Sequence, residues 1–377
     1  MAITVERVRG QRALQQFVRL PWRVYRGDRN WVPPLISERL DRLNPSRNPF
    51  FAQAQVELFL ARDGRRPVGT IAAFVDHHSN RHLGERMGGF GFFECLPDHS
   101  IADGLLTAAC ETVRAWGMEG IRGPINFGHF DEPGILIRGV DCPPAMLEAH
   151  SPLYYRDFLE RFGMTKDRDA YAWRVSLQPF IDGQGKLPEQ VLRVFAAASR
   201  RSGIRVRKAR LDDWDREVDL ACDLFNATLQ HLPEYVPTTR EAFRYLASQM
   251  RFLLDPDLAL FAETDGKAIG FVVALPDFNY LLRRLNGRLF PFGFLKILWH
   301  RRHIDTVSFK LFGVLEPYRR RGIDVLLYLE AVRSAAAKGY RWLDGSLTSE
   351  TNPTVNRLAE RLGAERYKHY RLYRMMF

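Results

Sequence analysis

Two distant segments of the chain repeat the same spacing of apolar positions. In each segment, apolar residues stand at i, i+3, i+4 and i+7, and a glycine follows them. The first set is Tyr155, Phe158, Leu159 and Phe162 before Gly163, and the second is Val355, Leu358, Ala359 and Leu362 before Gly363. Each set predicts an amphipathic helix that ends where a glycine can adopt a positive φ.

Two hairpin signals and two aromatic strands accompany these helices in the same order. Asp63-Gly64 precedes the apolar run 68–75, and Asp265-Gly266 precedes the run 268–275. Asp-Gly between strand-like runs indicates a tight β-turn. Each half then ends on an aromatic-rich strand, at 169–175 and at 367–373. We therefore expect a duplication, with an N-terminal domain at 1–177, a Pro- and Gly-containing linker at 178–188 and a C-terminal domain at 189–377.

The second half carries a complete order of elements. Strand patterns alternate with helical ones, and the fold class that this order predicts is α+β, with a mostly antiparallel sheet flanked by helices in each of two tandem domains. The expected elements are a strand at 204–208, helices at 213–229 and 241–253, a hairpin at 258–275, a strand at 306–315, a helix at 323–338, a strand at 341–346, the helix before Gly363 and the last strand.

Composition narrows the class of protein. With 46% hydrophobic and 26% charged residues in 377 positions, the chain is globular. No apolar run reaches the ~20 residues that span a bilayer, and the first residues lack a secretory apolar core, so we expect a cytoplasmic protein. Its four cysteines fit reduced thiols. The net charge of +11 implies attraction to an anion, which could be nucleic acid, a lipid headgroup or a phosphorylated cofactor. Because the arginines are scattered along the chain, a solvated surface explains most of them.

The loop 316–324 is the strongest candidate for an anion site. It runs from a strand into a helix through three arginines and a glycine, an arrangement that presents backbone N–H groups and the helix dipole to phosphate. Here the sequence resembles the GNAT N-acetyltransferase superfamily, whose loop reads Arg/Gln-x-x-Gly-x-Gly/Ala. Arg319 and Gly322 match, and Asp324 does not. Asn352, eleven residues before Gly363, also matches the family's pattern.

The resemblance implies a tandem GNAT protein that transfers an acetyl or longer acyl group from acyl-CoA to an amine. The pantetheine arm would follow the strand 306–315, with an N–H near Gly313 or Val314 polarising the thioester. The segment of the first copy that corresponds to the loop 316–324 has no matching arginine or glycine, and it carries Asp98 and Asp103 instead. We therefore expect one CoA site per chain, in the second copy. The implied cofactor-binding residues are Gly313, Val314, Leu315, Arg319, Arg320, Arg321, Gly322, Ile323, Asp324 and Asn352.

The proton-transfer groups are less defined. The family's usual tyrosine, seven residues after the Asn, is Ala359 here. The remaining catalytic candidates are Glu350, Ser346 and Thr348 around the end of the strand, and Tyr370 in the last strand. Glu350 could instead cap the following helix, and Tyr370 could be a core residue. Asn126 is a candidate substrate contact or a turn residue. We expect no metal, because the adjacent His77 and His78 point two ways on a strand.

Two further hypotheses remain. The alternative to an enzyme is a non-catalytic protein on a GNAT scaffold that binds nucleic acid or an anionic surface, although no nucleic-acid module fits the order of elements. The segment 277–303 inserts eleven large apolar residues among six arginines and lysines. It predicts either a lid over the acceptor cleft or a peripheral contact with anionic membrane.

Overall fold

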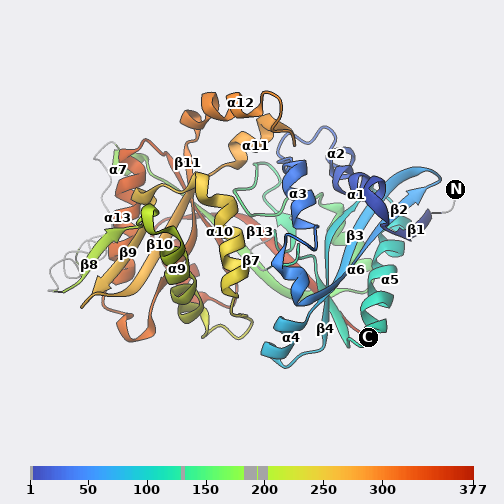
Figure 1. Cartoon of the computed structure of the whole chain (residues 1–377), viewed down its shortest axis with the longest axis horizontal. Coiled ribbons are helices and arrows are strands. Elements are labelled where there is room, and N and C mark those ends of the chain that lie inside the picture. The colour runs from blue at the N-terminus through green and yellow to red at the C-terminus, as the bar shows by residue number, and fades with distance from the viewer. Residues whose placement is uncertain (1–2, 129–131, 182–192, 194–202) are drawn as a thin grey trace. The chain divides into compact units, whose positions relative to one another are not determined.

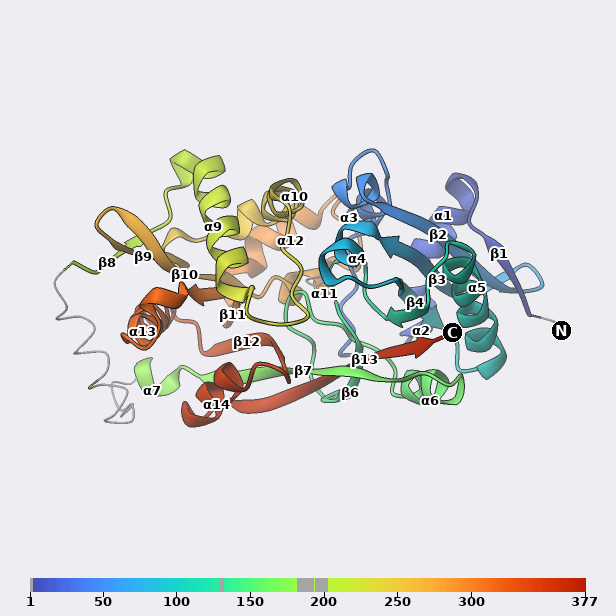
Figure 2. The ribbon, with the colours of Figure 1, turned by 90° about the horizontal axis from the view of Figure 1, so that it is seen from below.

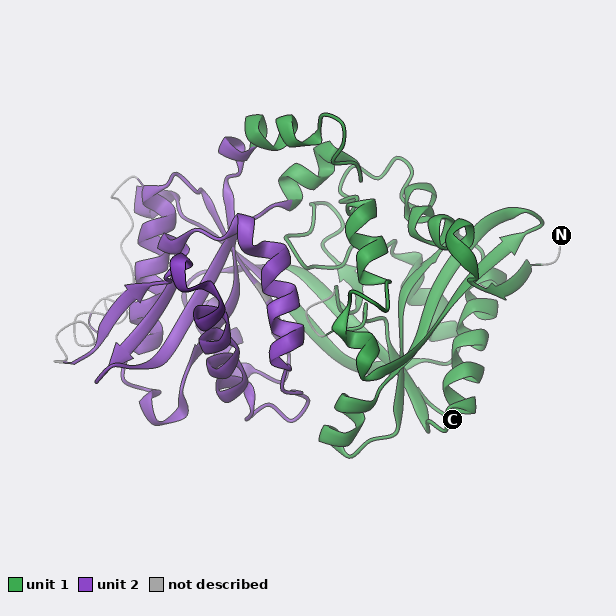
Figure 3. Ribbon diagram, in the orientation of Figure 1, with its two compact units in different colours: residues 1–171, 279–300, 367–377 green, residues 172–278, 301–366 purple. Residues whose placement is uncertain are grey.

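The computed structural model describes residues 3–128, 132–181, 193 and 203–377, and the chain divides into two compact units (Figures 1 and 3). Unit 1 consists of Met1–Tyr171, Asn279–His300 and Tyr367–Phe377. Unit 2 consists of Ala172–Phe278 and Arg301–Arg366. Each unit therefore takes segments from both halves of the sequence. Of the linker expected at 178–188, Gln178–Ile181 form the short helix α7, and residues 182–188 lie outside the described residues.

The sheet of unit 1 is antiparallel except at one pair of strands. Strands β1 to β4 pair in sequence order, β4 and β5 are parallel over Met87–Gly89, and β5 pairs with the part of β13 that belongs to this unit. β6 also pairs with β13. The strands are β1 (Ile3–Arg7), β2 (Ala54–Asp63), β3 (Arg66–Asp76), β4 (Met87–Cys95), β5 (Gly120–Gly123), β6 (Ile135–Arg138) and β13 (Glu365–Met376).

Helices cover both faces of this sheet because side chains alternate along each strand. Ile71, Ala73 and Val75 of β3 join the cluster under α5 and α6, whereas Ala72 and Phe74 pack on the side of α1 and α3. The helices are α1 (Gly10–Arg19), α2 (Pro21–Val24), α3 (Ile36–Arg42), α4 (His77–Leu83), α5 (His99–Ala115), α6 (Tyr154–Arg161), α11 (Asn279–Leu285) and α12 (Gly293–His300), with a 3₁₀ turn η1 (Pro49–Ala52).

Unit 2 repeats this plan. Strands β8 to β11 are antiparallel, β11 and β12 are parallel, and β7 follows β12 in strand order. Helix α13 lies on one face and α9 on the other (Figure 2). The elements are β7 (Thr165–Ser176), β8 (Arg205–Lys208), α9 (Trp214–Leu229), α10 (Arg240–Met250), β9 (Ala259–Thr264), β10 (Lys267–Pro276), β11 (Thr306–Val314), η6 (Glu316–Tyr318), α13 (Ile323–Ala337), β12 (Trp342–Ser349) and α14 (Pro353–Arg361), with 3₁₀ turns at 211–213, 251–253, 256–258 and 301–303.

The local signals of the duplication are confirmed. Gly163 and Gly363 follow α6 and α14 with φ of 98° and 73°. Asp265 and Gly266 both have positive φ, as the two-residue turn of a twisted hairpin requires. The predicted α+β fold with a mostly antiparallel sheet in each copy is also confirmed. The helix expected at 241–253 is shorter, because the chain tightens into a 3₁₀ turn after Met250.

In both units the parallel pair of strands separates after a few residues. Pairing of β4 with β5 ends at Gly89 and Arg122, and pairing of β11 with β12 ends at Phe309 and Gly345. Beyond these points β4 no longer pairs with β5, and β11 no longer pairs with β12. On the opposite edge, β4 has a bulge in its pairing with β3, and β11 has one in its pairing with β10. The two openings are where backbone groups of a sheet can meet a ligand.

Candidate functional site

The free stretch of β11 presents alternate backbone groups to the opening in unit 2. The N–H of Leu315 donates to the carbonyl of Ile269 at 2.9 Å, so in this antiparallel ladder the N–H of Gly313 also faces β10. Alternation then turns the N–H groups of Phe312 and Val314 toward the side from which β12 has diverged. Of the two residues that the sequence suggested as thioester contacts, Val314 is the one whose N–H faces this opening.

Gly313 has a packing role on the other side of the strand. A Cβ added at this position would lie 2.4 Å from Oγ1 of Thr228 in α9. Real Cβ atoms do not come this close to an oxygen, so only glycine lets α9 pack on β11 here. Thr228 is itself buried, and its hydroxyl donates to the carbonyl of Phe225 at 3.0 Å.

The loop after β11 leads into a helix that has no side-chain cap. Arg320 and Gly322 both adopt the left-handed conformation, with φ of 59° and 79°, and Gly322 is the N-cap of α13. Because glycine has no side chain, the N–H groups of the first turn can be satisfied by an anion in front of the helix. Asp324 lies in this turn and is half-buried. Its negative charge repels such an anion and interacts favourably with the positive end of the helix dipole.

The three arginines of the loop have different surroundings. Arg319 donates from Nε to the carbonyl of Val314 at 3.1 Å and from Nη2 to the carbonyl of Thr228 at 2.7 Å. It therefore ties the loop to β11 and α9, a structural role that sequence spacing did not predict. Arg320 and Arg321 are exposed, and the guanidinium of Arg321 lies 5.2 Å from the ring centroid of Tyr318. These two side chains supply positive charge at the surface of the loop.

The remaining candidates lie in two places. Asn352 caps α14 by accepting the N–H of Val355 at 3.4 Å, and Glu350 is half-buried in the turn before it. Ser346 lies within β12, and its side chain is outside the described part of the structure. Tyr370 belongs to unit 1, where it is fully buried and donates to Oε2 of Glu148 at 3.2 Å. This burial argues for the core role of Tyr370 and against a role at an open cleft.

In unit 1 the corresponding opening is filled by the chain's own side chains. The N–H of Leu96 donates to the carbonyl of Val68, so Leu96 takes the place of Leu315, and Cys95 takes the place of Val314. The N–H of Cys95 donates to the hydroxyl of Tyr155 at 2.9 Å. Its carbonyl accepts the hydroxyl of Tyr154 at 2.8 Å. The strand edge that is open in unit 2 is therefore covered here by two tyrosines of α6.

The helix after this edge is also closed to anions. The side chain of Asp98 caps α5, and its Oδ1 accepts the N–H of Ser100 at 2.9 Å. Short-range hydrogen bonds from Ser100 hold the pKa of Asp98 below its ordinary value, so a fixed negative charge stands where an anion would bind. The sequence analysis expected Asp98 to oppose an anion, and its capping geometry is consistent with that expectation.

Asn126 bridges the two separated strands of unit 1. Its Oδ1 accepts the N–H of Phe92, in the bulge of β4, at 2.7 Å, and its Nδ2 donates to Oε2 of Glu132 at 2.8 Å. Arg39 of α3 pairs with the other oxygen of Glu132. Asn126 thus satisfies a bulge amide, and the substrate contact that the sequence suggested for it stays a prediction.

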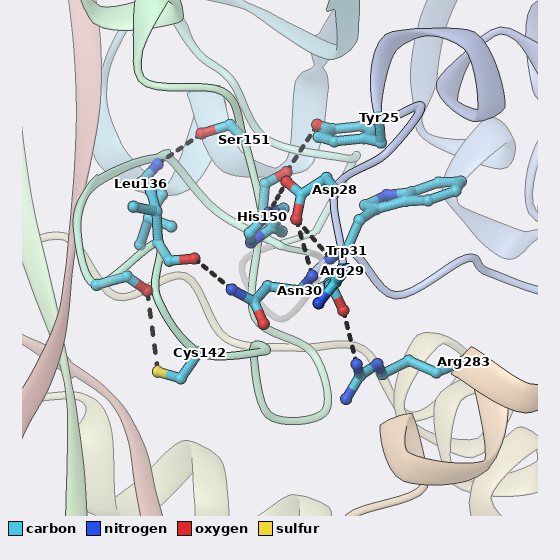
Figure 4. A network of polar contacts seen from close by, with 12 residues as sticks. Tyr25, Asp28, Arg29, Asn30, Trp31, Leu136, Cys142, His150, Ser151 and Arg283 are labelled. Carbon is cyan, nitrogen blue, oxygen red and sulfur yellow. Dashed lines mark hydrogen bonds and ion pairs between the residues drawn. The ribbon is translucent and has the colours of Figure 1, made fainter.

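A buried carboxyl group lies beside this bridge and was missed by the sequence analysis. Glu94 accepts the hydroxyl of Tyr155 at 2.7 Å and contacts the hydroxyl of Tyr25 at 3.2 Å. Tyr25 also donates to the carbonyl of His150 at 2.8 Å (Figure 4). A neutral Glu94 fits these contacts. The hydroxyl of Tyr25 has one proton, which it donates to the carbonyl of His150, so a protonated Glu94 can donate a hydrogen bond to the oxygen of Tyr25. Burial raises the pKa of Glu94 to about 8.

Comparisons with known proteins find relatives that match nearly the whole chain. A bacterial ceramide synthase of Caulobacter vibrioides is 33% identical over 367 residues, which cover 96% of this chain and 94% of that protein. The protein YghO of Escherichia coli K12 is 32% identical over 369 residues, which cover 96% of this chain and 92% of that protein. No protein-family model matches the sequence.

A solved structure decides the fold family. The tandem GNAT protein from the clavulanic acid biosynthesis pathway superposes with a TM-score of 0.60 at 13% identity, covering 99% of this chain and 98% of that one. This chain has a tandem GNAT fold. It belongs to the same family as the Caulobacter and Escherichia relatives.

The protein also contains a buried ionic cluster that sequence reasoning missed. In unit 2, Lys310 lies at the bulge of β11, where β12 separates, and its Nζ is 3.4 Å from Oδ2 of Asp344. Ser308 donates to the same oxygen. The side chains of Lys310 and Asp344 are 8% and 1% exposed. A lysine inside the apolar run 307–314 was the available signal.

Within the described ranges, no group of three or more His, Cys, Asp and Glu side chains could hold a metal ion. Among the helices that the structure describes, none has the length and apolar character to cross a bilayer.

Proposed function

We propose that this protein transfers an acyl group from an acyl-CoA thioester to an amine, with one acyl-CoA site in unit 2. The contrast between the two copies carries the proposal. Unit 2 combines a strand edge that faces an opening with a helix whose N-cap is Gly322. Unit 1 has the same elements, but Tyr154 and Tyr155 bind the edge of the strand, and the side chain of Asp98 caps the helix.

The acyl-CoA would bind along β11 and its following loop. Its pantetheine amides would pair with the edge of β11, and its pyrophosphate would meet the first turn of α13 beside Arg320 and Arg321. The N–H of Val314 is then the donor that stabilises negative charge on the thioester oxygen. Arg319 supports this arrangement indirectly, because it holds the loop against β11.

The reaction forms one C–N bond and breaks one C–S bond. The lone pair of the neutral amine attacks the thioester carbon, and the CoA sulfur leaves as a thiolate. The amine nitrogen gives up one proton, for which we propose Glu350 as the acceptor, because it follows β12 in the same unit as the loop. The thiolate takes a proton from solvent. Ser346 remains the second candidate on this strand.

The relatives suggest the class of acceptor. A ceramide is the amide of a fatty acid and a long-chain amino alcohol, and the relative from Caulobacter is named a ceramide synthase. We therefore propose a long-chain amine as the acceptor here and a fatty acyl-CoA as the donor.

Incubation of the purified protein with palmitoyl-CoA and sphinganine tests this reaction. Mass spectrometry should detect the amide in the same amount as the free thiol of CoA. Acetyl-CoA and a short amine such as ethanolamine serve as the comparison. Thiol release without amide would contradict amine acylation, and equal rates with ethanolamine would contradict a long-chain acceptor.

A further inference from the structure

The segment around α12 exposes more large apolar side chains than any other part of the chain that the structure describes. Six of the eleven exposed large hydrophobic residues lie here, and they are between 50% and 78% exposed. We call them the α12 surface: Phe290, Phe292, Phe294, Leu295, Leu298 and Trp299. Contiguous apolar side chains of this size mark a place where another apolar phase covers the protein.

The base of the α12 surface is fixed to unit 1 through α11. Nδ2 of Asn279 donates to the carbonyl of Pro144 at 3.0 Å, and Nη2 of Arg283 donates to the carbonyl of Arg29 at 2.6 Å (Figure 4). Asn286, just after α11, accepts the indole N–H of Trp22 at 2.8 Å. Leu281 and Leu285 are buried. The apolar residues of α11 therefore face the protein, and those of α12 face outward.

This division changes the interpretation of the arginines. The sequence analysis treated 277–303 as one surface, but Arg283 binds a backbone carbonyl of unit 1. Arg284 lies over the ring of Tyr280, 3.7 Å from its centroid. Both arginines therefore make contacts within the protein and hold α11 in place. Arg288 and Lys296, which are exposed, flank the α12 surface. Nζ of Lys296 donates to the carbonyl of Arg284 at 3.3 Å, and an ammonium group has two further donors for a phosphate. Arg301 and Arg302 follow the surface in sequence.

The positive charge of residues 279–303 indicates which kind of partner covers the α12 surface. Residues 279–303 contain six arginines and lysines and no aspartate or glutamate. A second copy of the chain would bring these like charges together, which disfavours self-association through this surface. An anionic bilayer offers both an apolar interior and phosphate groups, and each basic residue near it contributes about 1 kcal/mol.

We infer that the α12 surface docks the protein on anionic lipid bilayers, with its aromatic and leucine side chains among the acyl chains and Arg288 and Lys296 at the phosphates. Aromatic residues in this position favour the boundary between headgroups and hydrocarbon. The inference goes beyond the proposed reaction and does not depend on it, because a bilayer can bind whatever chemistry unit 2 performs.

Vesicle sedimentation tests the docking. The full chain should sediment with vesicles of 70% phosphatidylcholine and 30% phosphatidylglycerol, and binding should fall at least tenfold in the variant F290S/F294S/L298S/W299S. The control L153S/I181S removes exposed apolar residues elsewhere, which are 51% and 41% exposed, and it should bind like the wild type. The variant R288E/K296E should lose the preference for anionic over neutral vesicles.

Tryptophan quenching by brominated lipids localises the contact. Quenching should be present in the wild type and lost in W299F, and CoA binding by calorimetry together with circular dichroism should show that every variant remains folded. Failure of the wild type to bind anionic vesicles at low ionic strength would overturn the inference. So would unchanged vesicle binding by the fourfold variant, or a dimer in solution that only this variant loses.

Discussion

The backbone N–H of Cys95 donates to the phenol of Tyr155, at the place in unit 1 where Val314 of unit 2 faces an opening. One hydroxyl thus stands where a ligand amide would pair in the other copy. The same phenol donates to Glu94. Closure of the strand edge and burial of a carboxyl group are therefore parts of one arrangement.

Substitution of Gly322 by valine should weaken CoA binding by at least about tenfold, or ~1.4 kcal/mol, because a side chain at the N-cap blocks approach to the first turn of α13. Titration calorimetry with CoA measures the effect. The matched control is Gly339→Val at the other end of the same helix, where φ is 85° and an added Cβ meets nothing within 4 Å. Equal losses in both variants would contradict a specific role for the N-cap.

Removal of the two phenols in unit 1 should have unequal effects on stability. Tyr155→Phe leaves the N–H of Cys95 and an oxygen of Glu94 without this partner and should cost about 2–3 kcal/mol, whereas Tyr154→Phe, which affects one carbonyl, should cost about 1 kcal/mol. Urea denaturation compares them. The stoichiometry of CoA should stay at one per chain in both, since Asp98 still caps α5. A second CoA equivalent would show that the phenols alone exclude the ligand.

The contribution of Glu94 to the free energy of unfolding should fall as pH rises from about 5 to about 8. Glu94 has a folded pKa of about 8 against an ordinary value of 4.5, so in this window the folded chain holds a proton that the unfolded chain has lost. Its destabilising effect is absent below the lower pKa and complete above the higher one. Glu94→Gln should remove this part of the pH dependence, a few kcal/mol, and Glu111→Gln at an exposed position of α5 should not. An unchanged slope in Glu94→Gln would assign the dependence to other groups.

Lys310 and Asp344 should show strong energetic coupling. Each single change, Lys310→Met or Asp344→Asn, leaves a buried charge without its partner and should destabilise the chain by about 3–5 kcal/mol. The double variant should be more stable than the sum of these losses predicts, by at least about 1 kcal/mol. A double-mutant cycle from denaturation curves measures this term. Additive losses would mean that the two charges are stabilised by separate surroundings.

Short-range sequence patterns predicted helices and strands of the fold correctly, because turns and helix ends depend on residues close to them in the sequence. Asp265-Gly266 formed the expected turn, and Gly363 ended the expected helix. The order of these elements, together with the loop 316–324 and Asn352, led to the expected tandem GNAT fold, which the solved structures confirm. The loop 316–324 was found in the same way, since a glycine before a helix is visible in one short window.

The environment of individual side chains could not be found in this way. The pKa of Glu94 is raised because tertiary packing removes its carboxyl group from water, while hydrogen bonds with Tyr155 and Tyr25, far from it in sequence, offset part of this rise. Arg319 matched a phosphate-binding pattern, yet its guanidinium is directed to two backbone carbonyls. In both cases tertiary contacts decide the chemistry of the group, and no spacing rule reports them.

The place of β13 bears on how the chain folds as it is made. Residues Tyr373–Met376 of β13 pair with β5, which ends at Gly123, inside unit 1. A ribosome adds about 5–20 residues per second, so β5 waits on the order of tens of seconds for its neighbour. During this time its edge is open to other nascent chains. Gly120, Gly123 and the exposed Arg86–Glu119 pair lie at this edge, and they make the waiting strand a poor template for aggregation.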